Sequence, residues 1–340
     1  MIQINGKNGG GQILRTALTL SIITGEAFHI KNIRGQRKKS GLMRQHLACV
    51  KAAVEVSNAA TDGAELDSNE FIFSPNNIQS GDFHFRIGSA GSTTLLAQTI
   101  IPALLYADEK STVTIEGGTH NPLAPSAFYL EKVFLPQIRK MGAEVKLKFH
   151  RYGFAPAGGG IISLAIQPCE KLTPLHLMER GKEIGRSVIC HLAHIKETVA
   201  LREIKTACKV LGWRDAKSET ITIKKLSSGP GNCLNVMAEF NNVTAVTTAH
   251  GAHGVTSERV ARNAAKTMGK FLNSGASIDH QLADQLLLPL ALAGEGSYLT
   301  TPPTNHMLTN REVIEKFLPV EINFAETSNH LYQTTISHNK

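Results

Sequence analysis

The sequence has only five cysteines among 340 residues, and these are scattered without a Cys-x-x-Cys pair. An odd, dispersed set excludes a disulfide framework and a zinc knuckle, and it is typical of reduced thiols in a reducing compartment. The chain also lacks a long apolar run. Its most apolar stretches, near 95–105 and 286–293, are interrupted by glutamine or proline and fall well short of the roughly 20 residues that span a bilayer.

The first residues lack a basic segment followed by an apolar run, so we expect no secretory signal and predict a cytoplasmic protein. Hydrophobic residues make up 42% of the chain, which is ample for one large domain or two of ordinary size. The net charge of +8 favours contact with a polyanion. Many basic proteins bind no nucleic acid, so charge alone does not decide the partner.

Helix and strand patterns alternate along the chain. A short strand at Ile2 and Ile4 is followed by a glycine loop and by apolar residues at helical spacing up to Gly25. The same order recurs at 83–106, and a third apolar helix is expected at 282–293. Strands rich in β-branched residues are expected at 111–115 and 161–166. The pattern predicts a mixed α/β (α+β) fold with internal repetition.

The character of the chain changes near Arg180. We expect a strand at 182–191, a helix at 197–211 and a further helix at 257–272, and the repeat-like pattern resumes only after Gly275. Surface loops tolerate such insertions at little entropic cost. The sequence therefore predicts a discontinuous large catalytic domain, residues 1–180 and 277–340, and a small inserted domain, residues 181–276.

Three segments could bind anions. Gly9-Gly10-Gly11-Gln12 and Gly88-Ser89-Ala90-Gly91-Ser92 each open a helix, where free backbone amides and the helix dipole attract phosphate. A tight turn and simple helix capping are the respective alternatives. The third segment is rich in Arg and Lys between Arg34 and Arg44, and its guanidinium groups suit phosphate oxygens. A solvated basic loop is equally compatible with that pattern.

Histidine pairs three residues apart, at 191/194 and 250/253, lack the further ligands of a recognised metal site. His306 lies between an expected strand at 298–301 and a helix expected to end near Phe317. Loops between a strand and a helix often carry catalytic groups.

Five segments in this order and spacing resemble the RNA 3′-terminal phosphate cyclase family. They are Gly9–Arg15, Gly41–Leu47, Gly88–Ser92, Leu282–Leu286 and His306–Asn310. The resemblance implies a large domain of three repeated units, each pairing two helices with a four-stranded sheet. It also implies that the inserted domain is a smaller α/β unit of thioredoxin-like topology.

The resemblance implies a ligase-like enzyme that uses ATP to convert an RNA 3′-phosphate into a 2′,3′-cyclic phosphate. His306 would attack ATP, release pyrophosphate and carry AMP, which would pass to the RNA end before the 2′-hydroxyl closes the ring and expels AMP. Mg²⁺ or Mn²⁺ would assist. By motif correspondence the ATP-binding residues would be Gln98, Pro125, Gln281, Leu282, Ala283, Asp284 and Gln285, and the phosphate- or RNA-binding residues Arg15, Arg37 and Arg44.

The chain departs from the family pattern at several positions. Asn8 stands where relatives usually have a metal-binding glutamate, and an amide oxygen brings no charge to a metal. Gln281 replaces a tyrosine that stacks on adenine, which removes an aromatic face that contributes about 1 to 3 kcal/mol per base in nucleic-acid sites. The segment after Arg34 also differs, with Ser40 where relatives tend to have proline.

Two alternative functions remain open at this point. One is a non-catalytic RNA-binding relative in ribosome biogenesis, which the Asn8 and Gln281 departures keep open although His306 is present. The other is an enolpyruvate transferase of comparable repeated architecture, whose motifs do not match in detail. The resemblance leaves open whether the chain acts as a monomer or a homodimer.

Overall fold

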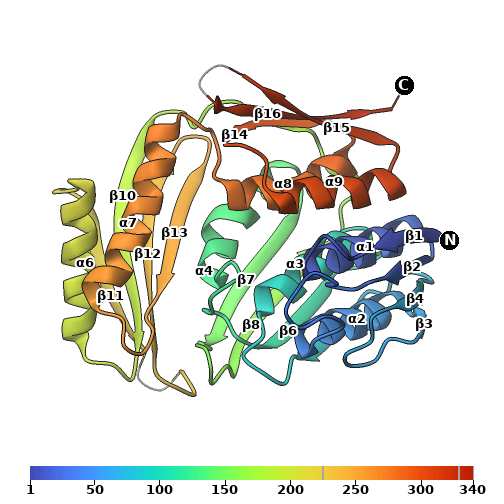
Figure 1. Cartoon of the computed structure of the whole chain (residues 1–340), viewed down its shortest axis with the longest axis horizontal. Coiled ribbons are helices and arrows are strands. Elements are labelled where there is room, and N and C mark those ends of the chain that lie inside the picture. The colour runs from blue at the N-terminus through green and yellow to red at the C-terminus, as the bar shows by residue number, and fades with distance from the viewer. Residues whose placement is uncertain (224–225, 328–329, 340) are drawn as a thin grey trace.

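The computed structural model describes residues 1–223, 226–327 and 330–339. These residues form four four-stranded sheets with helices packed against them (Figure 1), which confirms the mixed α/β class. All five cysteines are free. Among the described residues, no helix is both long enough and apolar enough to cross a membrane.

The N-terminal sheet has the strand order β1-β2-β4-β3, with β1 parallel to β2 and the other pairs antiparallel. Its first helix starts in the glycine loop and stops where Gly25 takes a left-handed conformation and donates its N–H to the carbonyl of Ser21. The elements are β1 (Ile2–Asn5), α1 (Gly11–Thr24), β2 (Phe28–Lys31), α2 (Arg44–Ser57), β3 (Ala60–Asp62) and β4 (Phe71–Ser74).

The second sheet repeats this connectivity, with the order β5-β6-β8-β7. Its second helix is a continuous helical segment in which a π-helical stretch joins two α-helical ones. The elements are β5 (Asp82–Arg86), α3 (Thr93–Leu104), β6 (Ser111–Gly117), α4 (Ala127–Tyr129), η1 (Leu130–Phe134), α5 (Leu135–Lys140), β7 (Glu144–Arg151) and β8 (Gly160–Gln167).

The third sheet has the equivalent order β9-β14-β16-β15, again with one parallel pair followed by antiparallel pairs. Its first strand and first helix are separated by about a hundred residues. The elements are β9 (Leu175–Leu177), α8 (His280–Ala293), β14 (Gly296–Thr300), α9 (Asn305–Phe317), β15 (Val320–Glu326) and β16 (Tyr332–His338).

The intervening segment forms the fourth sheet, whose order is β11-β10-β12-β13. Both of its helices pack on one another and on the sheet, and Figure 1 shows them on the left, away from the three related units. The elements are β10 (Glu183–Ala193), α6 (Glu197–Leu211), β11 (Lys217–Ile223), β12 (Gly231–Phe240), β13 (Thr244–His250) and α7 (Ser257–Ser274).

Buried apolar side chains fall into separate clusters. The largest joins the helices of all three related units with their sheets, whereas most buried side chains between 188 and 276 form a cluster of their own. Burial of a Leu, Ile or Phe side chain contributes about 1.5 to 3 kcal/mol. The two large clusters are therefore substantial cores in their own right.

The fourth sheet meets the second through a group of buried aromatic rings. His191 on β10 lies 5.1 Å from His120 and 5.4 Å from Phe128, between ring centroids. Burial lowers the pKa of His191 to about 4 and that of His120 well below its ordinary value. Both imidazoles are consequently uncharged at neutral pH, which suits the apolar rings around them.

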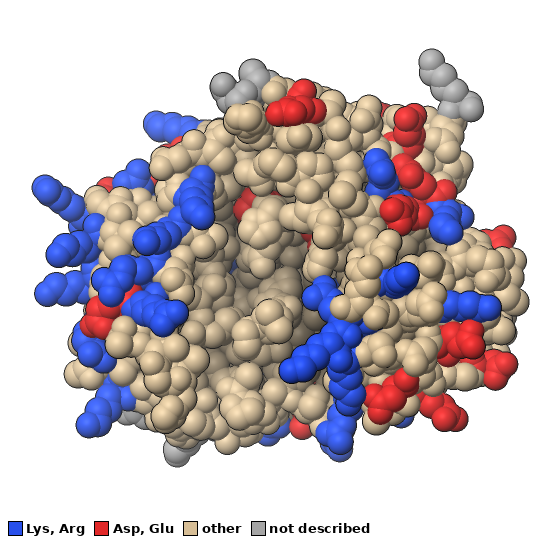
Figure 2. Space-filling model, viewed as in Figure 1, with Lys and Arg blue, Asp and Glu red and all other residues tan. Residues whose placement is uncertain are grey.

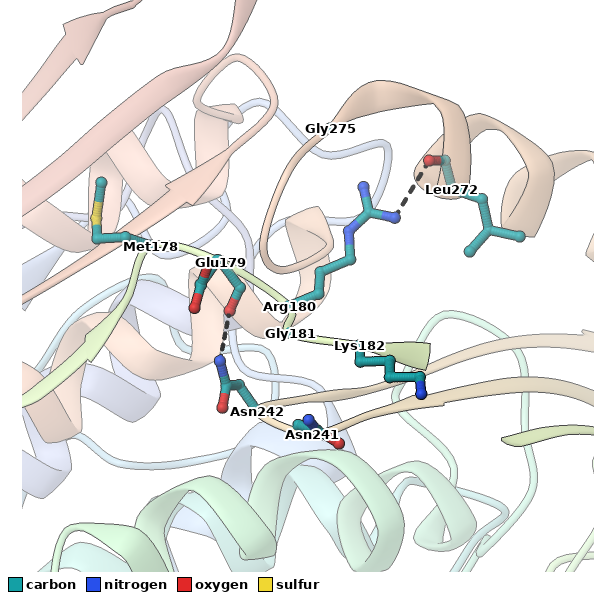
Figure 3. Close-up of a pocket in the computed structure, with 9 residues that line it drawn as sticks. All are labelled: Met178, Glu179, Arg180, Gly181, Lys182, Asn241, Asn242, Leu272 and Gly275. Atoms are coloured by element: carbon teal, nitrogen blue, oxygen red, sulfur yellow. Dashed lines mark hydrogen bonds between the residues drawn. The ribbon is translucent and has the colours of Figure 1, made fainter. Parts of the chain in front are cut away.

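The connections into and out of the fourth unit meet at Arg180 (Figure 3), beside a cavity of about 650 Å³. The Arg180 guanidinium donates hydrogen bonds to the carbonyl oxygens of Phe271 (3.0 Å), Leu272 (3.2 Å) and Ala276 (2.5 Å). It also lies 4.3 Å from the centre of the Phe271 ring. A cation at the C-terminal end of a helix satisfies carbonyls that have no partner within the helix. Arg180 thus caps α7 and joins the two connections.

We expect Arg180→Ala to lower the free energy of unfolding by about 2 to 4 kcal/mol, because several charge-assisted hydrogen bonds are lost together. Denaturant unfolding measures this, and limited proteolysis should show faster cleavage near 178–182 or 275–279. Lys182→Ala is the matched control, since its exposed side chain makes no hydrogen bond or ion pair within the described residues. Equal effects of the two changes would contradict this role of Arg180.

We further expect the free energy of unfolding to fall as the pH drops from about 6.5 to 4. In this range the imidazole of His191 takes up a proton in the unfolded state, whereas burial keeps it largely unprotonated in the folded state. By pH 4 the free energy of unfolding is therefore lower by about 3 kcal/mol. Unfolding curves at several pH values measure the slope, which His191→Gln should reduce. The exposed His84→Gln should leave the slope unchanged, and an unchanged slope in His191→Gln would refute the assignment.

Candidate active site

His306 occupies the first turn of α9, which begins where the Thr304 hydroxyl accepts a hydrogen bond from the Met307 N–H. Its side chain is 52% exposed, and its Nδ1 lies 3.7 Å from Oδ2 of Asp284 on α8. This distance is too long for a hydrogen bond, although catalytic contacts often shorten when substrate binds. A carboxylate beside Nδ1 favours the proton on that nitrogen and leaves the lone pair on Nε2 for attack.

Gln12 connects the glycine loop to this histidine. Its Nε2 donates to the backbone oxygen of His306 at 2.6 Å and to Oδ1 of Asp284 at 3.3 Å. The first turn of α1, the first turn of α9 and the second turn of α8 are therefore held together by one side-chain amide. The contact joins residues almost three hundred positions apart.

Further polar contacts fix the same helices. One turn along α1, the Thr16 hydroxyl donates to Oδ1 of Asn310 at 2.6 Å. Gln98 on α3 donates to Oε1 of Gln285 on α8, also at 2.6 Å. These side chains line a small cavity of about 80 Å³ together with Arg15 and Asp284.

The start of α1 is a candidate anion cradle, because free backbone amides at a helix start attract anions. The N-cap residue of α1 is Gly10, which has no side chain to accept hydrogen bonds from the first backbone N–H groups of the helix. Arg15 is largely buried beside Asp284, and burial lowers its pKa although an arginine stays charged. The guanidinium of Arg37 lies beside Gly10, where a side chain on that residue would crowd it.

His46, on α2, faces the same glycine loop. Burial, aided by Arg15 and Arg34, lowers its pKa to about 3, so the ring is uncharged at neutral pH. Its Nδ1 accepts a hydrogen bond from the Met43 N–H at 3.1 Å. The other ring nitrogen therefore carries the proton and offers a donor toward the start of α1.

Pro125 and Gln281 belong to neighbouring segments. Pro125 precedes α4, and its carbonyl accepts a hydrogen bond from the Thr94 hydroxyl at 2.6 Å. One turn further on, the Tyr129 hydroxyl lies 3.3 Å from the carboxylate of Asp279, which caps α8 just before Gln281. Burial raises the pKa of Asp279.

Leu282 and Ala283, both predicted at the nucleotide site, have buried side chains in the main apolar cluster. These side chains pack α8 against the main core, so only the backbone of the two residues could face a ligand. Gln281, in contrast, is exposed and lines a cavity of about 400 Å³ between α8 and the fourth unit.

The predicted metal ligand, Asn8, is exposed, and its Oδ1 accepts a hydrogen bond from Gln36 at 3.2 Å. Within the residues that the structure describes, no three His, Cys, Asp or Glu side chains gather into a metal-binding group. Magnesium and manganese prefer carboxylate oxygens. The described side chains around Asn8 therefore form no metal cage of their own, and substrate phosphates would have to supply most of the ligands of a bound Mg²⁺ or Mn²⁺. Arg44, the first residue of α2, is exposed.

The structure brings together His306, Asp284, Gln98, Gln285 and Arg15, and the same contacts reveal participants that were not predicted as site residues. These are Gln12, Thr16, His46 and Asn310. Gln12, His46 and Asn310 lie within the motifs identified in the sequence. The residue types within these motifs, rather than the spacing between the motifs, could have identified these three residues from the sequence.

A half-exposed histidine with a neighbouring carboxylate, next to a cationic helix start, is compatible with phosphoryl or nucleotidyl transfer and with other nucleophilic chemistry. Comparison with known proteins gives the family. The family model described as RNA 3'-terminal phosphate cyclase matches residues 6–324. This chain belongs to the RNA 3′-terminal phosphate cyclase family and is an enzyme of that kind.

Curated relatives carry the same name. The protein from Koribacter versatilis is 45% identical over 331 residues, which cover 97% of this chain and 93% of the relative. That from Pseudomonas aeruginosa is 46% identical and covers 95% and 94% respectively. A solved structure of the enolpyruvyl transferase NikO from Streptomyces tendae has a TM-score of 0.29 and 11% identity, with 98% of this chain and 81% of that one covered. That likeness is too low to support the enolpyruvate transferase alternative.

Gly11→Ala should reduce ATP-dependent activity at least tenfold, because the new methyl group would overlap Nε2 of His46 and displace it from the anion cradle. Gly269→Ala, within α7, is the matched control. Its methyl group would lie 3.7 Å from Cδ2 of Leu211, an ordinary van der Waals contact, so it should stabilise the protein by about 0.5 to 1 kcal/mol and leave activity intact. Steady-state kinetics and thermal unfolding distinguish the two, and full activity in Gly11→Ala would refute the cradle.

Proposed function

We propose that this enzyme cyclises RNA 3′-phosphate ends through an adenylate on His306. The observation that carries the proposal is the contact of Gln12 with both His306 and Asp284, since it sets the nucleophile beside the anion-binding start of α1. ATP is the substrate that supplies the adenylate. The family name and the retained His306 motif favour this chemistry over a purely RNA-binding role.

In the first step, Nε2 of His306 attacks the α-phosphorus of ATP. A P–N bond forms, the bond from that phosphorus to the bridging oxygen breaks, and pyrophosphate leaves with the electron pair. Asp284 holds the imidazole and stabilises the positive charge that develops on it. Arg15, Arg37 and the start of α1 supply preorganised donors for the phosphates.

In the second step, an oxygen of the RNA 3′-phosphate attacks the adenylate phosphorus, and the P–N bond breaks to return His306. The product is an RNA-3′-pp-5′-A anhydride. The neighbouring 2′-hydroxyl then attacks the RNA phosphorus and gives up its proton to solvent, and AMP leaves with the electron pair of the broken anhydride bond as the 2′,3′-cyclic ester forms. Proximity of the hydroxyl supplies much of the rate of this last step.

Nucleotide binding is assigned to the region between Pro125 and the first turn of α8. Gln98, Gln285 and Asp284 face the small cavity at its inner side. Gln281 offers an amide where relatives have an aromatic ring, and Leu282 and Ala283 offer only backbone. No step is assigned to Mg²⁺ or Mn²⁺ through Asn8, because the described residues hold no group of three His, Cys, Asp or Glu side chains beside it.

We also infer that residues 1–180 and 277–340 form one catalytic domain and that residues 181–276 form an inserted domain of thioredoxin-like topology. The separate apolar cluster and the junction at Arg180 support this division. Proteolysis at that junction should release a folded fragment. Cleavage spread over both parts would contradict it.

Incubation with α-labelled ATP should give an acid-labile protein adduct in the wild type and none in His306→Ala. Denaturing electrophoresis detects the adduct, and treatment with acid or hydroxylamine identifies a phosphoramidate. His176→Ala is the control, because its side chain is also about half exposed but lies on strand β9 and not on α9. An adduct that persists in folded His306→Ala would rule out this histidine as the carrier.

A further inference from the structure

The positive charge of the chain is concentrated in one part of it. Residues 181–276 contain fourteen Lys and Arg and seven Asp and Glu, a net charge of +7 out of +8 for the whole chain. The other residues, which hold the proposed catalytic centre, are almost neutral overall. Attraction of a polyanion therefore falls mainly to the fourth unit.

Within this unit, α7 presents a regular basic stripe, defined here as Arg259, Arg262, Lys266 and Lys270. Spacings of three, four and four residues place these side chains on one face of the helix. All four are exposed, and in the described part of the chain none makes a side-chain hydrogen bond or ion pair. Glu258, the acidic residue of the first turn, lies 3.9 Å from Arg202 of α6 instead.

The stripe leads to the active site. Lys270 and Gln281 line the same cavity of about 400 Å³, which lies between α7 and β13 on one side and the start of α8 on the other. Gln281 is one helical turn from Asp284, the carboxylate that faces His306. An RNA strand that runs from His306 along α8 would therefore reach Lys270 before the other residues of the stripe.

Figure 2 shows this distribution on the surface. Lys and Arg side chains gather over the part of the molecule that holds α6 and α7, and a central hollow separates them from a second basic group nearer α2. Acidic side chains are sparse along the rim of the hollow. A single strand that enters the hollow could lie against α7, where the exposed charges are mainly positive.

We propose that the basic stripe of α7 binds the phosphodiester backbone of the RNA upstream of its 3′ end. This rests on RNA being the substrate and adds a second contact region to the proposed catalytic centre. From Lys270 to Arg259 the stripe is about 16 Å long at 1.5 Å per residue. That length matches roughly five nucleotides of a stacked strand, at an axial rise of about 3.4 Å per nucleotide.

The test compares two double variants that remove the same charge at the same helical spacing. Arg262→Glu with Lys266→Glu alters the stripe, whereas Lys205→Glu with Lys209→Glu alters exposed residues on α6 of the same unit. Fluorescence anisotropy measures binding of a 15-nucleotide RNA with a 3′-phosphate in the absence of ATP. Circular dichroism and thermal unfolding check the fold, and Arg262→Gln with Lys266→Gln serves if charge reversal impairs it.

We expect the α7 variant to bind this RNA at least tenfold more weakly and to show a salt slope shallower by about 1.4, since roughly 0.7 is lost per single-strand phosphate contact. The α6 variant should change both quantities much less. Equal losses in the two variants would show that net charge alone attracts RNA and would overturn the proposal. Unchanged binding in a folded α7 variant would overturn it too.

Two further measurements separate this inference from the proposed chemistry. Labelling with α-labelled ATP should be the same in the α7 variant and the wild type, because the stripe does not contact ATP. A dinucleotide with a 3′-phosphate is too short to reach Arg262, so its turnover should also be unchanged. If the wild type forms no adduct but the binding difference persists, the cyclase mechanism fails and the RNA path stands.

Discussion

The active site depends on one side-chain amide that bonds to two other helices. Gln12 reaches from the first turn of α1 to the backbone of His306 and the carboxylate of Asp284. These residues come from the first and third of the related units, which have no strand pairing with each other. Helix packing within the shared apolar cluster therefore sets the relative positions of α1, α8 and α9, and the hydrogen bonds of Gln12 hold His306 and Asp284 beside α1.

Much of the local structure was predictable from the sequence. Apolar spacing and glycine placement predicted α1, and the helix expected at 197–211 coincides with α6. Several expected boundaries fell short; for example, α7 continues to Ser274, and β14 begins at Gly296. Such ends are decided by capping and by pairing with distant strands, which periodicity does not contain.

The proposed site was predictable only in part. Motif resemblance indicated His306 and Asp284, because both lie in short distinctive segments. It also indicated Leu282 and Ala283, whose side chains are in fact buried, since neighbours along a helix point in different directions. The roles of Gln12 and Thr16 depend on bonds to residues 294 positions away, and the pKa of His46 depends on burial beside two arginines.

The third unit has a consequence for how this family could diversify. Its strands β9 and β14 pair in parallel across the insertion, with Leu175 opposite Gly296, so the sheet closes regardless of what lies between them. The entropy of closing a loop grows only slowly with its length. The fourth unit can thus change in length and surface charge without altering the register of β9 against β14, provided that the buried ring of His191 still packs against His120 and Phe128.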